Sequence, residues 1–557
     1  MSHTRSWRSF SFIFFLLLGL CWSWALAGIS AEPERDRIVA EEFAHPPVST
    51  RPGAFWAWLE GHVSLDRITY ELEEMKAKGM GGADIWDVRA YINPGQMIPA
   101  GPTFLGAESL KAIGHTLREA KRLGLRMGMV AASGWNAGGT WVQPPDAGMG
   151  LFLSQVSVEG PTRFSRVLPF PEVPKDCPKD AQGRPLYYRH VAVLAVPQAE
   201  DRVFESSQSV VDLRDCYDDE REHLTWDVPA GQWTILRFVM SNTGYQLIAQ
   251  SANSGGPMID FLNPESTRMH FGTIMKRLES ELGDIREFPL DHLEVDSMEL
   301  GHHTIWTAQI LERFQKEYGY DPLKYLPLLK GYKTRDAEVR ERFLYDWKKL
   351  ISDVFIDSHY RTGSAFLRQY GVKLCAEAGG PGAPIWDTCP VDALKALGAV
   401  DIPRGEFWPK MRNIWLVKEI SSASHIYGKT IVDAESFTSW RHLQDSPYFY
   451  KLMADKAMSE GLNHFTFHTF AHSPDQAGLP GNYYHAGTHI NPNRVWWPMA
   501  GPFIEYLSRC CYLLRKGLFV ADVCYYYGDQ APNFVSAKGV DYSPGCGYDY
   551  DVVNSDV

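Results

Sequence analysis

The chain has 557 residues, of which 45% are hydrophobic and 13% are aromatic. This composition excludes a disordered protein, because the chain can bury one large core or several smaller ones. The formal net charge of −12 argues against nucleic acid or an anionic membrane as a partner. The nine cysteines form no CxxC pair, so the sequence predicts no cysteine-based zinc site.

The first residues predict an export signal. Arg5 and Arg8 precede an apolar run at 10–20, and residues 25–27 (ALA) supply a small-x-small cleavage site. The apolar run is shorter than the roughly 20 residues of a membrane span, and no later stretch approaches that length. We therefore expect residues 1–27 to be a signal peptide, and the mature protein to be periplasmic or extracellular without a membrane span.

Short apolar runs alternate with helical patterns along much of the chain, as in parallel strands joined by helices. Two clear helical patterns lie at 66–78 and 110–123. Eight apolar runs predict strands at 54–59, 83–88, 126–132, 292–296, 372–377, 399–402, 430–435 and 464–468. Eight such units in one array favour a closed (β/α)₈ barrel of the TIM type over an open sheet.

The pattern changes between residues 151 and 285. Short β-type runs are separated there by Pro, Gly and Asp clusters, which predicts an antiparallel β-sandwich inserted into the barrel. The barrel would then comprise residues 45–150 and 286–510. A further apolar run starts at 521, and the chain stops soon afterwards without a closing element. We therefore expect residues 518–557 to begin a second, truncated domain.

Carboxylates follow the predicted strands repeatedly. They are Asp296, Glu299, Glu377, Glu406 and Glu435. The carboxyl ends of barrel strands meet at one mouth, where active sites lie, although any single residue could instead cap a helix or pair with an arginine. Convergent carboxylates suit hydrolysis of a glycosidic bond, in which one group protonates the leaving oxygen and the other activates water or attacks directly.

Aromatic and amide side chains flank these carboxylates. Trp135 and Asn136 lie in the segment SGWNAGG, and Trp440 follows Glu435. Flat rings and amides are typical of sugar-binding sites, where rings stack on the sugar and amides bind its hydroxyls. Core packing explains any single tryptophan equally well. We expect Trp135, Asn136 and Trp440 to bind substrate.

Histidines recur at every fourth position at His464, His468 and His472. This spacing could form a metal-binding face on a helix. The alternating segment HFTFH predicts a strand instead, with His472 in the loop after it. We therefore expect His468 and His472 to contact sugar hydroxyls, with a structural role or a transition-metal site as the alternatives.

Long motifs run along almost the whole mature chain, including FAHPPVSTRPGAFWAWLEGHVS (43–64), VDSMELGHHTIWT (295–307) and SHIYGKTIVDAESFTSW (424–440). They resemble one family, the α-L-rhamnosidases of glycoside hydrolase family 106. The resemblance implies an inverting exo-hydrolase that releases L-rhamnose from pectin-like plant polysaccharides. It also implies calcium as a cofactor, with ligands that the sequence does not place.

The resemblance assigns roles to individual residues. The family's DSxE signature falls on Asp296 and Glu299, which makes Glu299 the general acid, and its AExFT signature makes Glu435 the general base. Asp346, in FLYDW, matches a further acidic position. Inversion implies carboxyl groups about 6.5–9.5 Å apart, and the acid needs a raised pKa. The expected substrate-binding residues are Asp296, Asp346, Glu377, Glu406, Trp135, Asn136, Trp440, His468 and His472.

Two positions depart from the family's pattern, and both could alter substrate choice. Glu60 stands where many members carry Asn, and Met298 replaces a common aromatic residue. The alternatives to a rhamnosidase are a barrel hydrolase acting on another sugar and a non-catalytic glycan-binding protein. The oligomeric state stays open.

Overall fold

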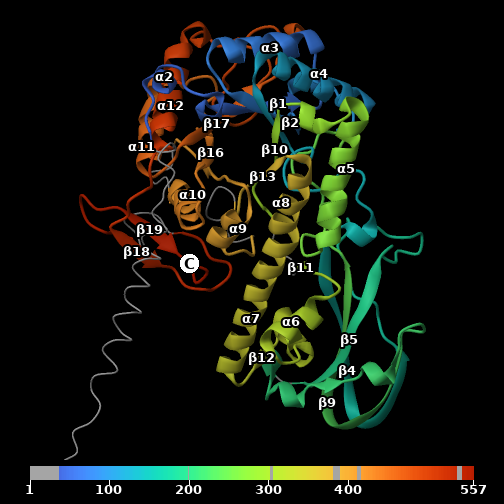
Figure 1. Cartoon of the computed structure of the whole chain (residues 1–557). Coiled ribbons are helices and arrows are strands. Elements are labelled where there is room, and N and C mark those ends of the chain that lie inside the picture. Colours follow the sequence, from blue (N-terminus) through green and yellow to red (C-terminus); the bar gives the residue numbers. More distant parts are fainter. Residues whose placement is uncertain (1–36, 199, 301–304, 380–388, 410–414, 536–541) are drawn as a thin grey trace, which may run out of the picture.

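The computed structural model describes residues 37–557 apart from 199, 301–304, 380–388, 410–414 and 536–541 (Figure 1). The predicted signal peptide, residues 1–27, lies outside the described residues. Within the described part of the chain, no helix has both the length and the apolar character needed to cross a membrane. Two main sheets, one parallel and one antiparallel, organise the molecule.

The core is a nine-stranded sheet in which every pairing is parallel. Its strands in spatial order are β14 (Ile402–Pro403), β13 (Lys373–Ala376), β10 (Leu290–Val295), β3 (Arg126–Val130), β2 (Gly82–Val88), β1 (Gly53–Leu59), β17 (His464–Ala471), β16 (Asp433–Ser436) and β15 (Glu406–Phe407). Each of the predicted apolar runs overlaps one of these strands. The prediction of an α/β chain built on a parallel sheet is confirmed.

The sheet is curled, and the strands at its two edges, β14 and β15, follow each other directly in the chain. Only Arg404 and Gly405 separate β14 from β15. The Arg404 N–H donates to the Ala376 carbonyl on β13 at 3.1 Å, and the Glu435 N–H on β16 donates to the Gly405 carbonyl at 2.8 Å. These two linking residues therefore hydrogen-bond to both flanking strands.

Several of the helices pack against the outside of the parallel sheet (Figure 1). The side chain of Ser64 caps α3 (Leu65–Ala77) by accepting from the Arg67 N–H at 3.4 Å, and α4 (Ala107–Leu123) ends at Gly124, whose φ is 66°. The helices are α2 (Ala40–Ala44), α3 (Leu65–Ala77), α4 (Ala107–Leu123), α5 (Pro264–Leu282), α6 (Ile310–Tyr318), α7 (Ala337–Phe355), α8 (Thr362–Leu367), α9 (Ala393–Ala399), α10 (Trp415–Ile426), α11 (Pro447–Ser459) and α12 (Gly501–Leu514).

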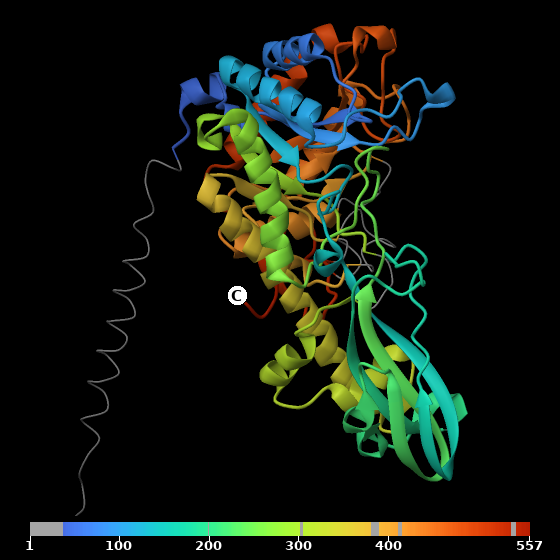
Figure 2. The ribbon, with the colours of Figure 1, turned by 90° about the vertical axis from the view of Figure 1, so that its right-hand side faces the viewer.

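The antiparallel sheet projects away from the parallel sheet (Figure 2). It has six strands, two of which pair along most of their length. The strands are β4 (Met149–Val167), β5 (Tyr188–Pro197), β7 (Val211–Asp212), β8 (Tyr217–Asp218), β9 (His223–Asn242) and β11 (Ile305–Trp306). A separate small pair joins β6 (Val203–Phe204) to β12 (Lys333–Thr334).

The predicted β-sandwich is not confirmed, because the described residues form one antiparallel sheet here. Side chains of β5 alternate between two apolar clusters. Leu194 packs into the main core, whereas Val193 packs with Phe164 and Trp226 from the far halves of β4 and β9. Those far halves cover the second face of their own sheet, so the face is buried without a second stacked sheet.

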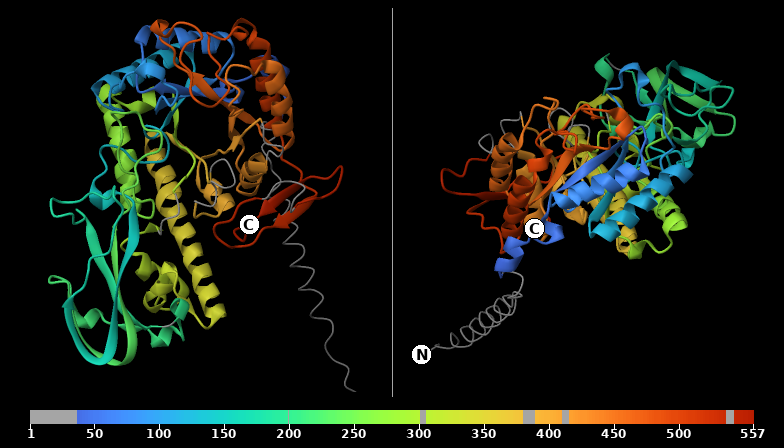
Figure 3. Two further views of the ribbon diagram at one scale, coloured as in Figure 1. Left: turned by 180° about the vertical axis from the view of Figure 1, so that it is seen from behind. Right: turned by 90° about the horizontal axis from the view of Figure 1, so that it is seen from above.

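The strands β18 (Val523–Tyr526) and β19 (Tyr550–Val553) form a small parallel pair on the flank opposite the antiparallel sheet (Figures 1 and 3). They are tied to α10. The Lys418 ammonium donates to Asp549 at 3.0 Å, and the Ser422 hydroxyl donates to Asp551 at 3.0 Å. The second domain expected from residue 518 onward stays a prediction.

A buried guanidinium bridges the interior of the curled sheet. Arg404, which is 1% exposed, donates from Nη2 and Nε to Asp433 on β16 at 2.7 and 3.0 Å. Its Nη1 donates to Asp84 on β2 at 2.9 Å. Because β16 and β2 are not adjacent, this one side chain spans the interior and neutralises two buried carboxylates.

Replacing Arg404 with methionine is expected to lower the free energy of unfolding by about 3–5 kcal/mol, because two buried carboxylates lose their cation. The matched control is Arg335→Met, whose guanidinium forms an exposed ion pair with Glu205 and should cost no more than about 1 kcal/mol. Urea denaturation followed by circular dichroism measures both. Equal, small losses would show that Arg404 does not stabilise the interior.

Candidate active site

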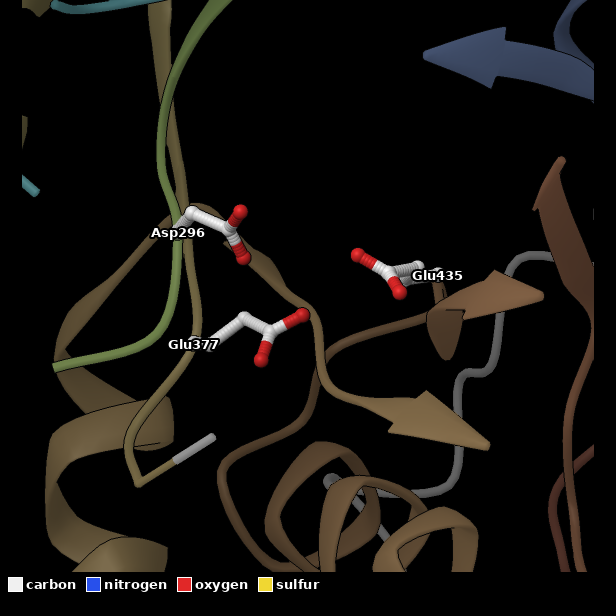
Figure 4. A group of neighbouring side chains, drawn as sticks. All are labelled: Asp296, Glu377 and Glu435. Atoms are coloured by element: carbon white, nitrogen blue, oxygen red, sulfur yellow. The ribbon is translucent and has the colours of Figure 1, made fainter. Parts of the chain in front are cut away.

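Three buried carboxylates converge at the carboxyl edge of the parallel sheet (Figure 4). Asp296 follows β10, Glu377 follows β13 and Glu435 lies in β16. One carboxylate oxygen from each lies within 4.8 Å of those of the other two. The side chains of Asp296 and Glu377 point toward Glu435 across the gap between the strands. Parallel strands bring their carboxyl ends to one edge, which explains the convergence.

Two further carboxylates predicted from the sequence lie beside this cluster. Glu406, at the start of β15, is buried and accepts a hydrogen bond from the Trp408 indole N–H. Glu299 accepts from the Ser297 hydroxyl at 3.1 Å. The charge of Glu435 acts on the pKa of both Glu406 and Glu299, which places all of them in one electrostatic group.

Glu435 is the carboxylate of the cluster whose hydrogen-bond partners most clearly stabilise its ionised form. The Thr438 hydroxyl donates to its Oε1, and His468 Nδ1 lies 3.1 Å from the same oxygen. Burial acts to raise the pKa of Glu435, but His468 and these hydrogen bonds outweigh burial and hold the pKa below its usual value. A buried carboxylate that stays ionised is suited to accept a proton.

The pKa values of the other carboxyl groups in the site are shifted upward, opposite to that of Glu435. Burial, followed by repulsion from Glu435, raises the pKa of Asp296 to about 7. Burial also raises the pKa of Glu299, although the hydrogen bond from Ser297 opposes the shift. The pKa of Glu377 is raised well above its usual value by burial and then by Asp296. Carboxyls with oppositely shifted pKa values in one site can serve as an acid and a base.

The predicted aromatic and amide residues occupy three positions around the cluster. Asn136, held at a φ of 74°, donates from Nδ2 to the Ser297 carbonyl at 2.7 Å and so positions the segment that carries Glu299. The Trp135 indole N–H lies close enough to Glu299 to lower the pKa of that carboxyl. Trp440 is 39% exposed and packs edge-on against Trp408, with ring centroids 4.5 Å apart.

Two predicted substrate-binding residues lie elsewhere. Both ring nitrogens of His472 are engaged, because Nε2 accepts from the Ser64 N–H at 3.1 Å and Nδ1 lies 2.9 Å from Glu71. The side chain is buried beside α3 and has no free polar atom for a sugar. Asp346, on α7, accepts from the Tyr320 hydroxyl at 2.9 Å. The structure does not bring either residue to the carboxylate cluster.

Tyr484 belongs to the site but carries no signal in the sequence. Its ring centroid lies 5.7 Å from that of His468 and 4.9 Å from that of Trp86. The side chain is 2% exposed, and its hydroxyl has no hydrogen-bond partner among the described residues. Tyr484 comes from a loop beyond β17, so only the folded chain places it. Thr438, by contrast, follows Glu435 within the AESFT segment and could have been noticed there.

A curled parallel sheet with buried, convergent carboxylates at its strand ends is the arrangement of a barrel-type glycoside hydrolase. Comparison with known protein families supports the same class of enzyme. The sequence profile of the α-L-rhamnosidases, glycoside hydrolase family 106, matches residues 44–206 and 185–557, and the chain therefore belongs to this family. The resemblance seen in the sequence motifs is confirmed.

Individual relatives cover most of this chain but are longer themselves. A putative beta-glucuronidase from Formosa agariphila is 30% identical in an alignment of 546 residues that covers 92% of this chain and 44% of that protein. The structure of a rhamnosidase from Novosphingobium sp. PP1Y is similar with a TM-score of 0.78 at 22% identity, over 92% of this chain and 64% of that one. The chain thus spans less than half of the curated relative, and the structural similarity supports the fold.

Proposed function

We propose that the protein hydrolyses α-L-rhamnosides with inversion, with Glu299 as the general acid and Glu435 as the general base. The observation that carries this proposal is the different hydrogen bonding of the two carboxylates in one cluster. Glu435 is contacted by Thr438 and His468, which favours its ionised form. Glu299 receives one hydroxyl hydrogen bond, from Ser297, and burial raises its pKa, which favours the protonated form that a general acid needs.

In the proposed reaction Glu435 removes a proton from a water molecule whose oxygen attacks the anomeric carbon of rhamnose. The bond from that carbon to the leaving oxygen breaks, and the Glu299 carboxyl donates its proton to the leaving oxygen. Glu435 ends protonated and Glu299 ends ionised, and exchange with solvent restores both. The single displacement turns an α-glycoside into β-L-rhamnose.

The fold that supports this function is, in our proposal, a closed eight-stranded barrel. β14 and β15 would be two halves of one strand, because Arg404 and Gly405 between them hydrogen-bond to both neighbouring strands. Closure would put every strand end on one rim, where the substrate would be a rhamnose-bearing, pectin-like polysaccharide. Export of the protein by the predicted signal peptide would bring it to such polymers, which lie outside the cell.

The experiment is to follow sugar release by ¹H NMR from p-nitrophenyl α-L-rhamnoside. We expect free L-rhamnose whose first-formed anomer is β. First formation of the α anomer would contradict inversion. The parallel substrate is p-nitrophenyl β-D-glucuronide, because of the name given to the Formosa agariphila relative. Turnover of the glucuronide without turnover of the rhamnoside would show that the enzyme acts on a sugar other than rhamnose. Binding of either glycoside without turnover would support a non-catalytic glycan-binding protein.

The cluster also fits a calcium ion, and we propose that Asp296, Glu377 and Glu435 hold one. All three offer oxygen, which calcium prefers, and neither carboxylate oxygen of Glu377 has a hydrogen-bond partner among the described residues. When bound, calcium would offset the mutual repulsion of these buried charges and would attract sugar or water oxygens. A zinc site of the usual nitrogen and sulfur donors does not fit this set.

Glu377→Gln is expected to weaken calcium binding by about tenfold or more, because one of three charged ligands is lost. Isothermal titration of chelator-treated protein with Ca²⁺ measures the affinity, and at one Ca²⁺ concentration the thermal unfolding midpoint should rise less in Glu377→Gln than in the wild type. The matched control is Glu338→Gln, an exposed carboxylate paired with Arg342. Equal affinity in both variants would exclude Glu377 as a ligand.

A further inference from the structure

The loop that follows β2 carries a cation and an aromatic ring at the rim of the site. Arg89 is exposed, and its guanidinium carbon lies 5.7 Å from the ring centroid of Tyr91, which is 46% exposed. In the part of the chain that the structure describes, no carboxylate lies within 4.0 Å of the Arg89 guanidinium, although most arginines there form an ion pair. Arg89 and Tyr91 thus form an exposed pair free to contact a ligand.

A continuous series of ring contacts connects this pair to the catalytic residues. The Tyr91 ring centroid lies 6.2 Å from that of Tyr484, and the Tyr484 centroid lies 5.7 Å from that of His468. His468 in turn contacts Glu435 at 3.1 Å. Tyr91 is therefore two ring contacts from the residue that touches the proposed base.

The charge of the proposed acid, Glu299, also acts on Tyr91. Burial raises the pKa of the Tyr91 phenol, Arg89 opposes this shift, and the charge of Glu299 adds to it. Because a general acid protonates the leaving oxygen, the sugar that leaves must lie on the Glu299 side.

We propose that Arg89 and Tyr91 form a subsite for an acidic sugar, bound as the leaving group next to the rhamnose. This inference rests on the proposed hydrolase function and specifies its substrate class. A guanidinium offers paired N–H donors that match a carboxylate or a sulfate ester, and an exposed phenol ring offers a face for a sugar ring to stack on. The acidic group is either a hexuronic carboxylate or a sulfate ester.

The site needs such a cation if its substrate is anionic. Glu435 is held in its ionised form, and the whole chain has a net charge of −12, so an acidic sugar would otherwise be repelled. An unpaired, exposed guanidinium costs the protein little in water, and it gains a charge-assisted hydrogen bond only when an anion binds. Arg89 therefore favours an acidic leaving group over a neutral one.

The test compares matched substrates. They are L-rhamnose α-linked to a hexuronic acid, its carboxyl-reduced neutral form, a sulfated form of that neutral disaccharide, and p-nitrophenyl α-L-rhamnoside. The variants are Arg89→Gln and, as control, Arg221→Gln, an exposed arginine of the antiparallel-sheet region paired with Asp218. Each kcat/KM is measured from L-rhamnose release.

We expect the wild type to prefer one acidic disaccharide over the neutral form. Arg89→Gln should lower kcat/KM on that acidic substrate by about tenfold or more, while its rate on the neutral disaccharide changes less than about threefold. Arg221→Gln should behave as wild type on all substrates. A preference for the uronate or for the sulfate ester identifies the acidic group.

Equal losses on acidic and neutral substrates, or none on either, would overturn the subsite. So would a wild type that hydrolyses the neutral disaccharide as well as both acidic ones. Failure of the wild type to release rhamnose even from the p-nitrophenyl glycoside would instead contradict the proposed hydrolase function. The aryl substrate, which has no acidic sugar, thus separates the two failures.

Discussion

Replacing Glu435 with glutamine is expected to lower kcat on α-L-rhamnosides by about 10²–10⁴-fold, because the side chain can no longer take a proton from water. The amide keeps the size of the carboxylate, and its oxygen can still accept from the Thr438 hydroxyl. The fold should therefore be retained, as checked by circular dichroism. Stopped assays of rhamnose release measure kcat.

Azide supplies the specific readout for this variant. A small anion needs no base to attack the anomeric carbon, so azide should restore turnover of an activated aryl rhamnoside by Glu435→Gln and yield β-L-rhamnosyl azide. A purely structural defect would not be rescued in this way. Glu338→Gln, at an exposed position, is the control and should keep the wild-type rate. A Glu435→Gln enzyme within tenfold of wild type would remove Glu435 from the role of base.

Replacing Glu299 with glutamine should produce a loss that depends on the leaving group. On a rhamnosyl disaccharide the expected loss in kcat/KM is about 10²–10⁴-fold, because a sugar oxygen leaves poorly without a proton. On p-nitrophenyl α-L-rhamnoside the loss should be much smaller, since nitrophenolate leaves without one. The ratio of the two losses is the measurement, and equal losses on both substrates would contradict the role of acid.

The pH profile gives a second test of Glu299. A general acid works in its protonated form, so wild-type kcat/KM should fall as the pH rises through the pKa of Glu299. Burial raises this pKa, so the fall should occur at a higher pH than for an ordinary glutamate. The Glu299→Gln enzyme should lose this alkaline limb. If kcat/KM of this variant still falls at the same high pH, the fall must come from the titration of another group.

The pattern of apolar runs is enough to predict the parallel sheet, and with it most of the acidic cluster. Buried parallel strands are apolar on both faces, so runs such as 54–59 and 83–88 stand out from the amphipathic helices between them. Once a parallel sheet is inferred, topology brings the strand ends together. Glu377 and Glu435 therefore converge as expected, because Glu377 directly follows β13 and Glu435 lies near the carboxyl end of β16.

The tertiary structure decided which polar residues reach the site. His468 and His472 look alike in the sequence, but His468 lies within β17 beside Glu435, whereas His472 lies just beyond the strand and turns toward Glu71. Tyr484 reaches the site from a loop whose path no local pattern predicts. Loop geometry depends on packing with distant segments, so sequence spacing does not determine it.

The protonation states depend on the fold in the same way. The sequence names Glu299 and Glu435 as two similar carboxylates, each ordinary in isolation. Burial raises the pKa of Glu299, whereas at Glu435 the contacts with His468 and Thr438 outweigh burial and lower it. The sequence thus determined the strands and the carboxylates at their ends. The charge on each carboxylate follows from the folded structure, because pKa shifts arise from burial and from neighbours in space rather than neighbours in the chain.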